Sequence, residues 1–258
     1  MTPLKNVTVL ITGASSGIGQ ACAEAFANKG ARLIVAARRS DRIRQLAKKL
    51  ERKHHVDVHW VKLDVRDRVR VRQAIEGLPK IWRAIDILVN NAGLSRGLEK
   101  IHEADLRDWE EMIDTNVKGL LYVTRAVMPG MIARNRGHIV NIGSVAGHEV
   151  YPGGSVYCAT KHSVKALNKA MRLDAFGTDV RVTGVDPGLV ETEFSLVRFH
   201  GDRERAGRVY QGMRPLSAGD VACAVVWACE RPGHVNIENM IIMPTGQASA
   251  GMVNRTQQ

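Results

Sequence analysis

A tyrosine and a lysine lie four residues apart near the start of the amphipathic segment SVYCATKHSVKALNKAMRLDAF, at Tyr157 and Lys161. Side chains at this spacing share one face of a helix. A free tyrosine has a pKa of about 10, which is too high for an efficient base at neutral pH, and a nearby cation favours its phenolate form. The pair therefore suggests proton transfer, although a solvated lysine beside a half-buried aromatic residue would give the same pattern.

Two other polar residues are placed where a site could use them. Ser144 ends an apolar, strand-like run in NIGSVAG, thirteen residues before Tyr157. Asn116, in DTNVKG, lies inside a predicted helix, where asparagine has poor propensity. Its side chain is therefore expected either to form a local hydrogen bond or to face the site.

A glycine-rich stretch, ITGASSGIGQA, joins the first predicted strand to the first helix and carries glycines at 13, 17 and 19. Glycine permits a tight turn and a close approach of the backbone to a pyrophosphate, which then rests on the helix N-terminus. The spacing is not the common GxGxxG, and a structural turn remains the alternative. The strand–turn–helix context favours a dinucleotide.

The end of the second predicted strand indicates which dinucleotide. A free ribose 2′-hydroxyl usually meets an acidic residue here, whereas a 2′-phosphate calls for arginine. Ala37 fills the acidic position, and Arg38 and Arg39 follow it, so the sequence predicts NADP(H) unless these arginines only begin a solvated basic helix. Asp64, at the end of the third strand, could accept a hydrogen bond from adenine or could cap a helix. NNAG (90–93) ends the fourth strand with small residues that let a ligand pass close to the backbone.

These residues require a scaffold in which strand ends meet. Apolar runs alternate with helical patterns along the whole chain, and the runs are continuous enough to be covered on both faces. We therefore expect an α/β fold: one Rossmann-type domain over 1–258, with a doubly wound parallel sheet and helices on both faces. Segment 188–213 follows the sixth strand, where ligands bind, and is expected to be a substrate lid. Residues 244–258 are expected to be a tail or an arm to a neighbour.

Composition narrows the function. The net charge is +11, but aromatic residues are only 5% and do not alternate with the basic ones, so we expect no nucleic-acid partner. The four cysteines form no CxxC pair, which argues against a metal site. The apolar part of the longest uncharged run, VTVLI, is too short for a signal core or a membrane span, so we expect a cytoplasmic protein with no membrane partner.

Taken together, TGxxxGIG, NNAG, the mid-helix asparagine, Ser144, Tyr157-x-x-x-Lys161 and DPG (186–188) resemble the short-chain dehydrogenase/reductase family over essentially the whole chain. The stretches GLVETEFSLVRFHGD (188–202), YPGGSVYCATK and MPTGQASAG resemble its NADP-dependent 3-hydroxy acid dehydrogenase branch, which includes serine and allo-threonine dehydrogenases. The resemblance implies a seven-stranded sheet and hydride transfer between NADP and a 3-hydroxy acid. It also implies homotetramers joined through helices such as 105–134 and 155–177.

The resemblance also assigns roles. Tyr157 would exchange the proton of the substrate hydroxyl, Ser144 would bond the substrate oxygen, Lys161 would hold the nicotinamide ribose, and Asn116 would position a water that feeds protons to Lys161. The cofactor-binding positions would be Gly13, Ser15, Ser16, Gly17, Ile18, Gly19, Arg38, Arg39, Asp64, Val65, Asn91, Ala92, Gly93, Tyr157, Lys161, Pro187, Gly188, Val190 and Thr192.

The substrate carboxylate needs a cation, and Arg198 is the first one beyond the sixth strand. Its neighbours are apolar, so lid closure could carry it into a partly dry pocket. The alternative for Arg198 is a salt bridge to Glu193 or Asp202. Two other functions stay open: a reductase of an uncharged or acyl-carrier substrate, and a catalytically silent NADP-binding sensor or scaffold. His148 and Glu149, which precede the tyrosine, depart from the pattern of this branch and are expected near the mouth of the pocket.

Overall fold

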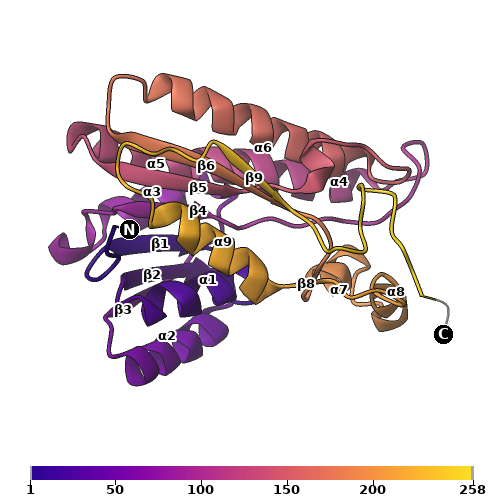
Figure 1. The fold of residues 1–258 in the computed structure, drawn as a ribbon, viewed down its shortest axis with the longest axis horizontal. Coiled ribbons are helices and arrows are strands. Elements are labelled where there is room, and N and C mark those ends of the chain that lie inside the picture. Colours follow the sequence, from indigo (N-terminus) through magenta and orange to yellow (C-terminus); the bar gives the residue numbers. More distant parts are fainter. Residues whose placement is uncertain (1, 257–258) are drawn as a thin grey trace.

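The computed structural model describes residues 2–256, and its centre is a parallel sheet of seven strands (Figure 1). The strands follow the order β3-β2-β1-β4-β5-β6-β9, so the chain winds outward in both directions from β1 and β4. Their bounds are β1 Thr8–Thr12, β2 Arg32–Ala37, β3 Val58–Lys62, β4 Ile87–Asn90, β5 Gly137–Ile142, β6 Val180–Pro187 and β9 Asn239–Ile242. The predicted doubly wound seven-stranded fold is confirmed.

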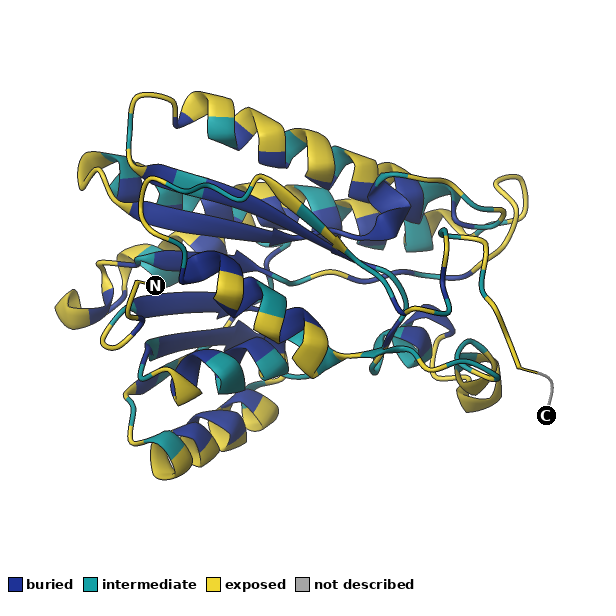
Figure 2. Cartoon of the chain, viewed as in Figure 1, coloured by how far each residue is buried: buried dark blue, intermediate teal, exposed yellow. Residues whose placement is uncertain are grey.

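Two layers of helices cover the sheet, which explains the continuous apolar runs in its strands. On β1, Val9 and Ile11 face one core while Leu10 faces the other, and all three are buried. The first core is closed by α1 (Gly17–Asn28), α2 (Ser40–His54) and α9 (Ala218–Cys229). The second is closed by α3 (Arg68–Glu76), α5 (Leu120–Ala133) and α6 (Ser155–Asp174). In Figure 2 the central strands are buried along their length, whereas the helices of the two covering layers show exposed stripes.

The long helical region before residue 134 is not uniform. It begins as α4 (Leu106–Ile113), passes through one wide π-helical turn (Asp114–Gly119) and continues as α5. Such π turns occur frequently at functional sites. Here the turn contains Asn116, the residue whose type is unusual for a helix interior.

The segment after β6 folds into short elements beyond the carboxyl ends of the strands (Figure 1). It contains β7 (Val190–Glu191), α7 (Phe194–Arg198) and α8 (Arg203–Arg208), and β7 pairs with β8 (Leu216–Ser217). Residues from 246 to 256 return across it, with the Thr256 amide donating to the Gly212 carbonyl at 2.9 Å. The predicted tail therefore packs against its own chain over the described residues, and its last two positions lie outside them.

Between residues 2 and 256, the helices are all too short or too polar to cross a membrane. Nor does the described part of the chain gather three or more His, Cys, Asp or Glu side chains in a group that could hold a metal ion.

Candidate functional site

A cavity of about 830 Å³ opens at the carboxyl ends of the strands, within the size range of small-molecule sites. Its lining contains every residue proposed from the sequence for the cofactor, the chemistry or the substrate, except Gly19 and Asn116. Residues from the ends of β1, β2, β4, β5 and β6 meet here, as the topology of a doubly wound sheet requires.

The glycine loop is packed too tightly for side chains. Gly13 has a φ of +66°, and a Cβ there would lie 2.9 Å from the Ala92 Cα. A Cβ on Gly19 would lie 2.6 Å from the Gly13 carbonyl oxygen, so Gly19 acts by letting α1 pack against the loop. The Asn91 side chain donates to the Thr12 and Gly13 carbonyls, at 3.0 and 3.3 Å. The loop and NNAG thus form one cradle of backbone at the head of α1.

The strand-end arginines lie beside this cradle. Arg39 donates from Nε to Ser15 Oγ at 3.1 Å and from Nη2 to Ser16 Oγ at 2.6 Å. Arg38 lies 3.6 Å from a carboxylate oxygen of Glu111 and remains half exposed. Both guanidinium groups therefore stay near the surface of the cavity, where a phosphate could reach them.

Asp64 does not cap the helix that follows it. Asp67 caps α3, accepting from the amides of Val69 and Arg70. Asp64 instead binds Arg66, with Oδ2 2.6 Å from Nη2. The helix-cap alternative for Asp64 is therefore wrong, and its carboxylate lines the cavity together with Val65.

Asn116 fixes the segment after NNAG. Its Oδ1 accepts from the Leu94 amide at 2.8 Å, and its Nδ2 donates to the Leu94 carbonyl at 2.8 Å and to Thr160 Oγ1 at 3.1 Å. The side chain is 2% exposed and lies behind the cavity wall. The structure therefore shows the hydrogen-bond alternative for Asn116, and the Asn116 side chain itself does not line the cavity.

Tyr157 and Lys161 occupy the first two turns of α6 and are both buried. Lys161 Nζ donates to the Ile142 carbonyl at 2.9 Å and lies 5.9 Å from the centre of the Tyr157 ring. Ser144 Oγ accepts from the Ala146 amide at 3.1 Å and donates to the Pro187 carbonyl at 3.5 Å. The helical spacing and the strand end therefore bring the three side chains to one wall of the cavity.

Burial governs the charges of this pair. It raises the pKa of Tyr157 well above its usual range, Tyr151 adds to the effect, and the Arg198 guanidinium and the Ser144 hydrogen bond oppose it. Burial lowers the pKa of Lys161 to about 8, against the opposing charge of Asp186. The sequence predicts that Lys161 and the positive nicotinamide ring together favour the phenolate of Tyr157. In the protein itself, Arg198 is a cation that lowers the pKa of this tyrosine against the effect of burial.

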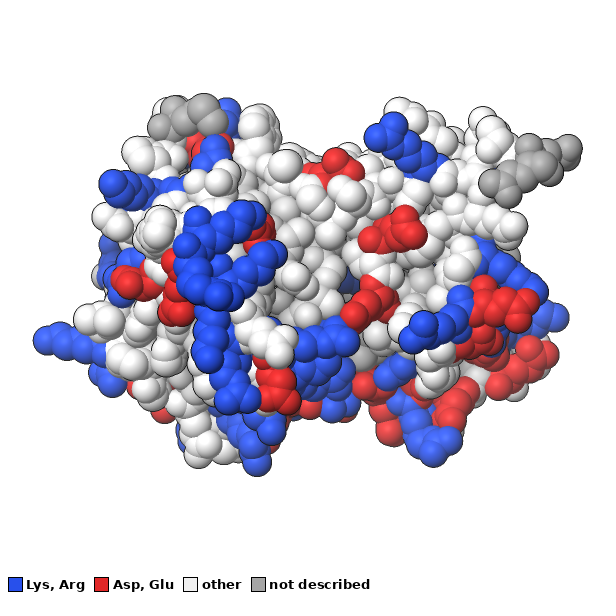
Figure 3. Space-filling view, turned by 90° about the horizontal axis from the view of Figure 1, so that it is seen from below, with Lys and Arg blue, Asp and Glu red and all other residues white. Residues whose placement is uncertain are grey.

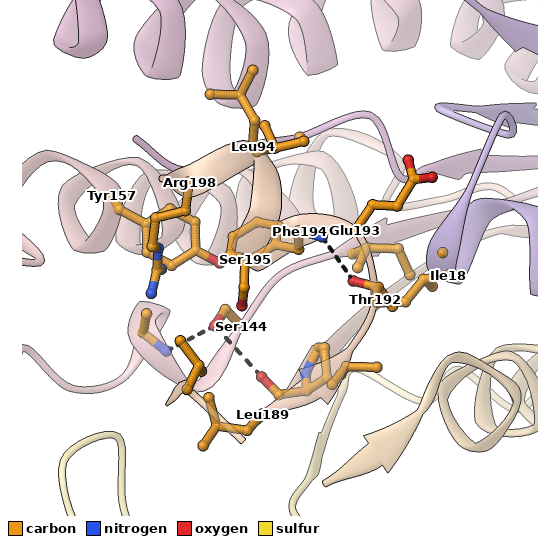
Figure 4. A pocket seen from close by; sticks show the side chains of 18 of the residues that line it. Ile18, Leu94, Ser144, Tyr157, Leu189, Thr192, Glu193, Phe194, Ser195 and Arg198 are labelled. Carbon is orange, nitrogen blue, oxygen red and sulfur yellow. Dashed lines mark hydrogen bonds between the residues drawn. The ribbon is translucent and has the colours of Figure 1, made fainter. Parts of the chain in front are cut away.

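Arg198 reaches the cavity from α7 of the predicted lid. Its guanidinium carbon lies 5.3 Å from the centre of the Tyr157 ring and 5.2 Å from that of Phe194, and Nη2 donates to the Tyr151 hydroxyl at 3.1 Å. Figure 4 shows Arg198 and Tyr157 together beside Ser144. The side chain is buried, and its Nε has no hydrogen-bond partner.

The alternative salt bridges of Arg198 do not form. Glu193 pairs with Arg39 and Arg42 instead, and Asp202 caps α8 through the Arg205 amide at 3.0 Å. Over residues 2–256 no carboxylate lies within 4.0 Å of Arg198. The lid therefore brings a buried cation to the site without neutralising it.

Several residues of the site were not found from the sequence. Tyr151 and Phe194 enclose Arg198, while Glu193 and Arg42 join the lid to α2. Tyr151 and Phe194 could have been proposed from the sequence. Tyr151 begins the turn-like stretch YPGG, and Phe194 lies in an apolar part of the predicted lid. The ion pair between Glu193 and Arg42 gives no signal in the sequence, because its partners lie 151 residues apart.

The unusual residues before α6 have structural partners. His148 Nε2 lies 2.5 Å from Asp186 Oδ2, which also accepts from Asn239 Nδ2 at 2.7 Å. Glu149 accepts from the Ala250 amide at 2.8 Å and so joins this loop to the tail. Tail positions 250, 251, 253 and 255 also line the cavity.

Basic side chains are concentrated on α2, beside the end of the cavity that contains Arg38 and Arg39. Seen from the side of α2, Lys and Arg cluster on one side of an uncharged hollow (Figure 3). The exposed face of α2 supplies Arg42, Arg44, Lys48, Lys49, Arg52 and Lys53. A field of this sign attracts anionic cofactors and substrates.

Known proteins resemble the chain over nearly its whole length. The family model for short chain dehydrogenases matches residues 7–201. The NADP-dependent 3-hydroxy acid dehydrogenase of Salmonella typhimurium is 49% identical over 245 residues, covering 95% of this chain and 97% of that protein. The NADP-dependent 3-hydroxy acid dehydrogenase of Schizosaccharomyces pombe is 45% identical over 258 residues, which is 100% of both chains.

A solved structure described as the closed form of serine dehydrogenase complexed with NADP⁺ superposes with a TM-score of 0.90. It shares 46% sequence identity and covers 97% of this chain and 100% of its own. Serine dehydrogenase from Escherichia coli superposes with a TM-score of 0.81 at 42% identity, covering 94% of this chain and 100% of its own.

Proposed function

Because the chain belongs to the short-chain dehydrogenase family, we propose that it is an NADP-dependent oxidoreductase that interconverts a 3-hydroxy acid and the matching 3-oxo acid or semialdehyde. Serine, allo-threonine, 3-hydroxypropionate and 3-hydroxybutyrate are the candidate substrates. The observation that carries this proposal is Arg198: a buried guanidinium, free of any carboxylate over the described residues, against the ring of Tyr157. A substrate carboxylate would supply the missing anion.

The cavity fits a dinucleotide with a 2′-phosphate. A Cβ at Gly13 or Gly19 would collide with backbone, which is the cradle that a pyrophosphate needs. Ala37 leaves the strand end without an acid, and Arg38 and Arg39 follow it. Thr192 lies within 3.3 Å of the Cβ position of Gly17, so the start of the lid would close over this end of the cofactor.

The remaining cofactor contacts would come from the neighbouring strand ends. Asp64 and Val65 line the cavity and would face the adenine, and Asn91 to Gly93 line it as well. Pro187, Gly188 and Val190 line the side from which the lid begins, and Ile18 lies at the head of α1. NADP supplies the hydride acceptor or donor, and its oxidised ring carries a positive charge that favours the phenolate form of Tyr157.

Tyr157 would exchange the proton of the substrate hydroxyl. Ser144 would hydrogen-bond the same oxygen as charge develops on it, because Ser144 and Tyr157 line the same cavity. The Arg198 cation lowers the pKa of Tyr157, and a charged Lys161 would add to this once the site is complete. Lys161 would also hold the nicotinamide ribose. Asn116 would act through position, by fixing Leu94 and supporting the water that feeds protons to Lys161.

Segment 188–213 would work as the substrate lid, because α7 carries Arg198 over the tyrosine. Closing it would exclude water from the charge pair and strengthen the hold on the carboxylate. The tail at 244–258 would brace this lid, since the Arg255 guanidinium donates to the Val209 carbonyl at 3.0 Å.

The proposed assembly is a cytoplasmic homotetramer. Exposed apolar side chains remain on or just after the helices expected to join the subunits, at Leu106, Leu121, Leu173 and Phe176. Phe176 is 91% exposed, which favours burial by a second copy of the chain. Light scattering of the purified protein would test the tetramer.

A substrate comparison tests the proposed reaction. We expect 3-hydroxybutyrate to be oxidised with NADP⁺ at least about tenfold more efficiently than 2-butanol, the scale of one charge-assisted bond of roughly 1.5–3 kcal/mol. Serine and 3-hydroxypropionate in the same series define the substrate further. Equal efficiency for the acid and the alcohol would favour a reductase of uncharged or acyl-carrier substrates. Failure to oxidise NADPH with any carbonyl compound would favour a silent NADP-binding protein.

A further inference from the structure

The lid carries a carboxylate into the part of the cavity that should recognise the cofactor's 2′-phosphate. Glu193 Oε2 lies 2.8 Å from Arg39 Nη1, and Glu193 Oε1 lies 2.7 Å from Arg42 Nη1. The other two guanidinium nitrogens of Arg39 donate hydrogen bonds to the hydroxyls of Ser15 and Ser16 in the glycine loop. One guanidinium thus connects the cradle, the strand end and the lid.

We propose that Glu193 is a specificity-determining residue that competes with the 2′-phosphate of NADP for the guanidinium groups of Arg39 and Arg42. The inference rests on the proposed function, because it presumes that these arginines receive the phosphate. It adds Arg42, on the first turn of α2, to the residues that recognise the cofactor.

Competition between Glu193 and the 2′-phosphate is expected because both are anions that would bind the same two arginines. The two arginines share one carboxylate, and hydrogen bonding from Arg39, reinforced by Arg42, holds the pKa of Glu193 below its usual value. Glu193 is therefore an anion at neutral pH. A phosphate monoester carries a charge of about −1.5 to −2, and two anions on the same pair of cations repel each other. The phosphate should displace the carboxylate rather than join it.

The existing ion pairs are weak enough to be displaced. The three side chains are 39–49% exposed, so solvent screens their attraction and each pair contributes little to stability. A phosphate offers more oxygens and more charge to the same planar donors. The carboxylate therefore lowers the affinity for NADP without blocking the site.

The contact also connects the two ends of the cavity. Glu193 lies between Thr192, which sits over Gly17, and Phe194, which starts α7 and packs against Arg198. Displacing Glu193 frees the start of α7 from α2. NAD lacks the 2′-phosphate and would leave this contact in place, so Glu193 couples the identity of the cofactor to the position of the lid.

The test compares Glu193→Gln with Glu191→Gln. Glu191 is an exposed carboxylate two residues earlier, on β7, and makes no ion pair within the described residues, so it controls for the change in net charge. Calorimetric titration with adenosine 2′-phosphate and with NADPH measures the phosphate contact directly, and titration with NADH is the reference.

We expect Glu193→Gln to tighten NADPH and adenosine 2′-phosphate binding by about two- to fivefold, within the worth of one exposed charge pair, and to change NADH binding less than twofold. Glu191→Gln should change none of the three. Equal tightening of NADPH and NADH would overturn the proposal, because the carboxylate would then act on lid opening alone. Weaker NADPH binding would overturn it too, because Glu193 would then assist the phosphate. If the wild-type protein shows no preference for NADPH over NADH, the proposed cofactor itself is wrong, which is a separate result.

Discussion

At the scale of single residues, Tyr157 is the buried group that would exchange a proton with the substrate hydroxyl. Tyr157→Phe removes one oxygen and little volume, so we expect turnover to be lost while NADPH binding changes little. Lys161→Ala should reduce both, because Lys161 would hold the ribose as well. Turnover measured beside cofactor titration separates the two variants. Near-normal turnover by Tyr157→Phe would contradict the proposed proton transfer.

Arg198 is predicted to act on the substrate and on Tyr157. Arg198→Met should lower the efficiency on 3-hydroxybutyrate by tenfold or more, the scale of one lost charge-assisted bond of roughly 1.5–3 kcal/mol. The efficiency on 2-butanol, measured at alkaline pH, should not change. Since Arg198 lowers the pKa of Tyr157, its loss should move the acid limb of the oxidation profile to higher pH for both substrates.

Arg203→Met is the matched control for that prediction, because Arg203 belongs to the same lid but does not line the cavity. Its pH profiles should match those of the wild-type protein. A parallel loss on acid and alcohol at every pH in Arg198→Met would reject the carboxylate anchor and leave Arg198 as a residue that closes the lid.

At the scale of elements, the loop at 147–154 is held to β6 by one buried contact. Asp186 is 3% exposed and accepts from His148 and Asn239, while the outer nitrogen of His148 lies 3.0 Å from Lys165 Nζ. We expect His148→Ala to cost about 2–3 kcal/mol in the free energy of unfolding, because it leaves a buried carboxylate short of a donor. Lys165→Ala removes only the exposed member and should cost less than about 1 kcal/mol.

Urea unfolding measures both variants. Because the loop carries Tyr151, which bonds Arg198, His148→Ala should also raise the KM for the acid substrate. Equal and small losses of stability in the two variants would show that the His148–Asp186 contact does not hold the loop.

At the scale of the whole molecule, the sequence predicted the sheet well because its signals are local. Runs such as VTVLI and LIVAA are buried on both faces, and the glycine loop, Tyr157 and Lys161 follow fixed spacings within single elements. The features that the sequence did not predict depend on contacts between residues far apart in the chain. Nothing near Glu193 indicates Arg39, 154 residues away, and the tail lacks any periodicity that would predict its packing over Gly212. The raised pKa of Tyr157 depends on burial, which the motif alone does not reveal.

Stability should depend on pH through Lys161. Burial lowers the pKa of Lys161 in the folded protein to about 8, from 10.5 for the free side chain. Below pH 8 both states bind this proton, and the folded state bears the full cost of burying the cation. Between pH 8 and 10.5 the unfolded state binds more protons, so this group makes the folded protein more stable as pH rises.

Lys161→Met lacks this dependence. We therefore expect the unfolding free energy of wild type minus that of Lys161→Met to increase by about 2 kcal/mol between pH 7 and pH 9.5, because each pKa unit corresponds to about 1.4 kcal/mol. Urea unfolding at both pH values gives the difference. Lys169→Met, on the exposed face of the same helix, is the control for removing a lysine from α6. An offset for Lys161→Met that stays constant with pH would mean that Lys161 keeps its charge throughout this range, and that the charged lysine is available to Tyr157 even at alkaline pH.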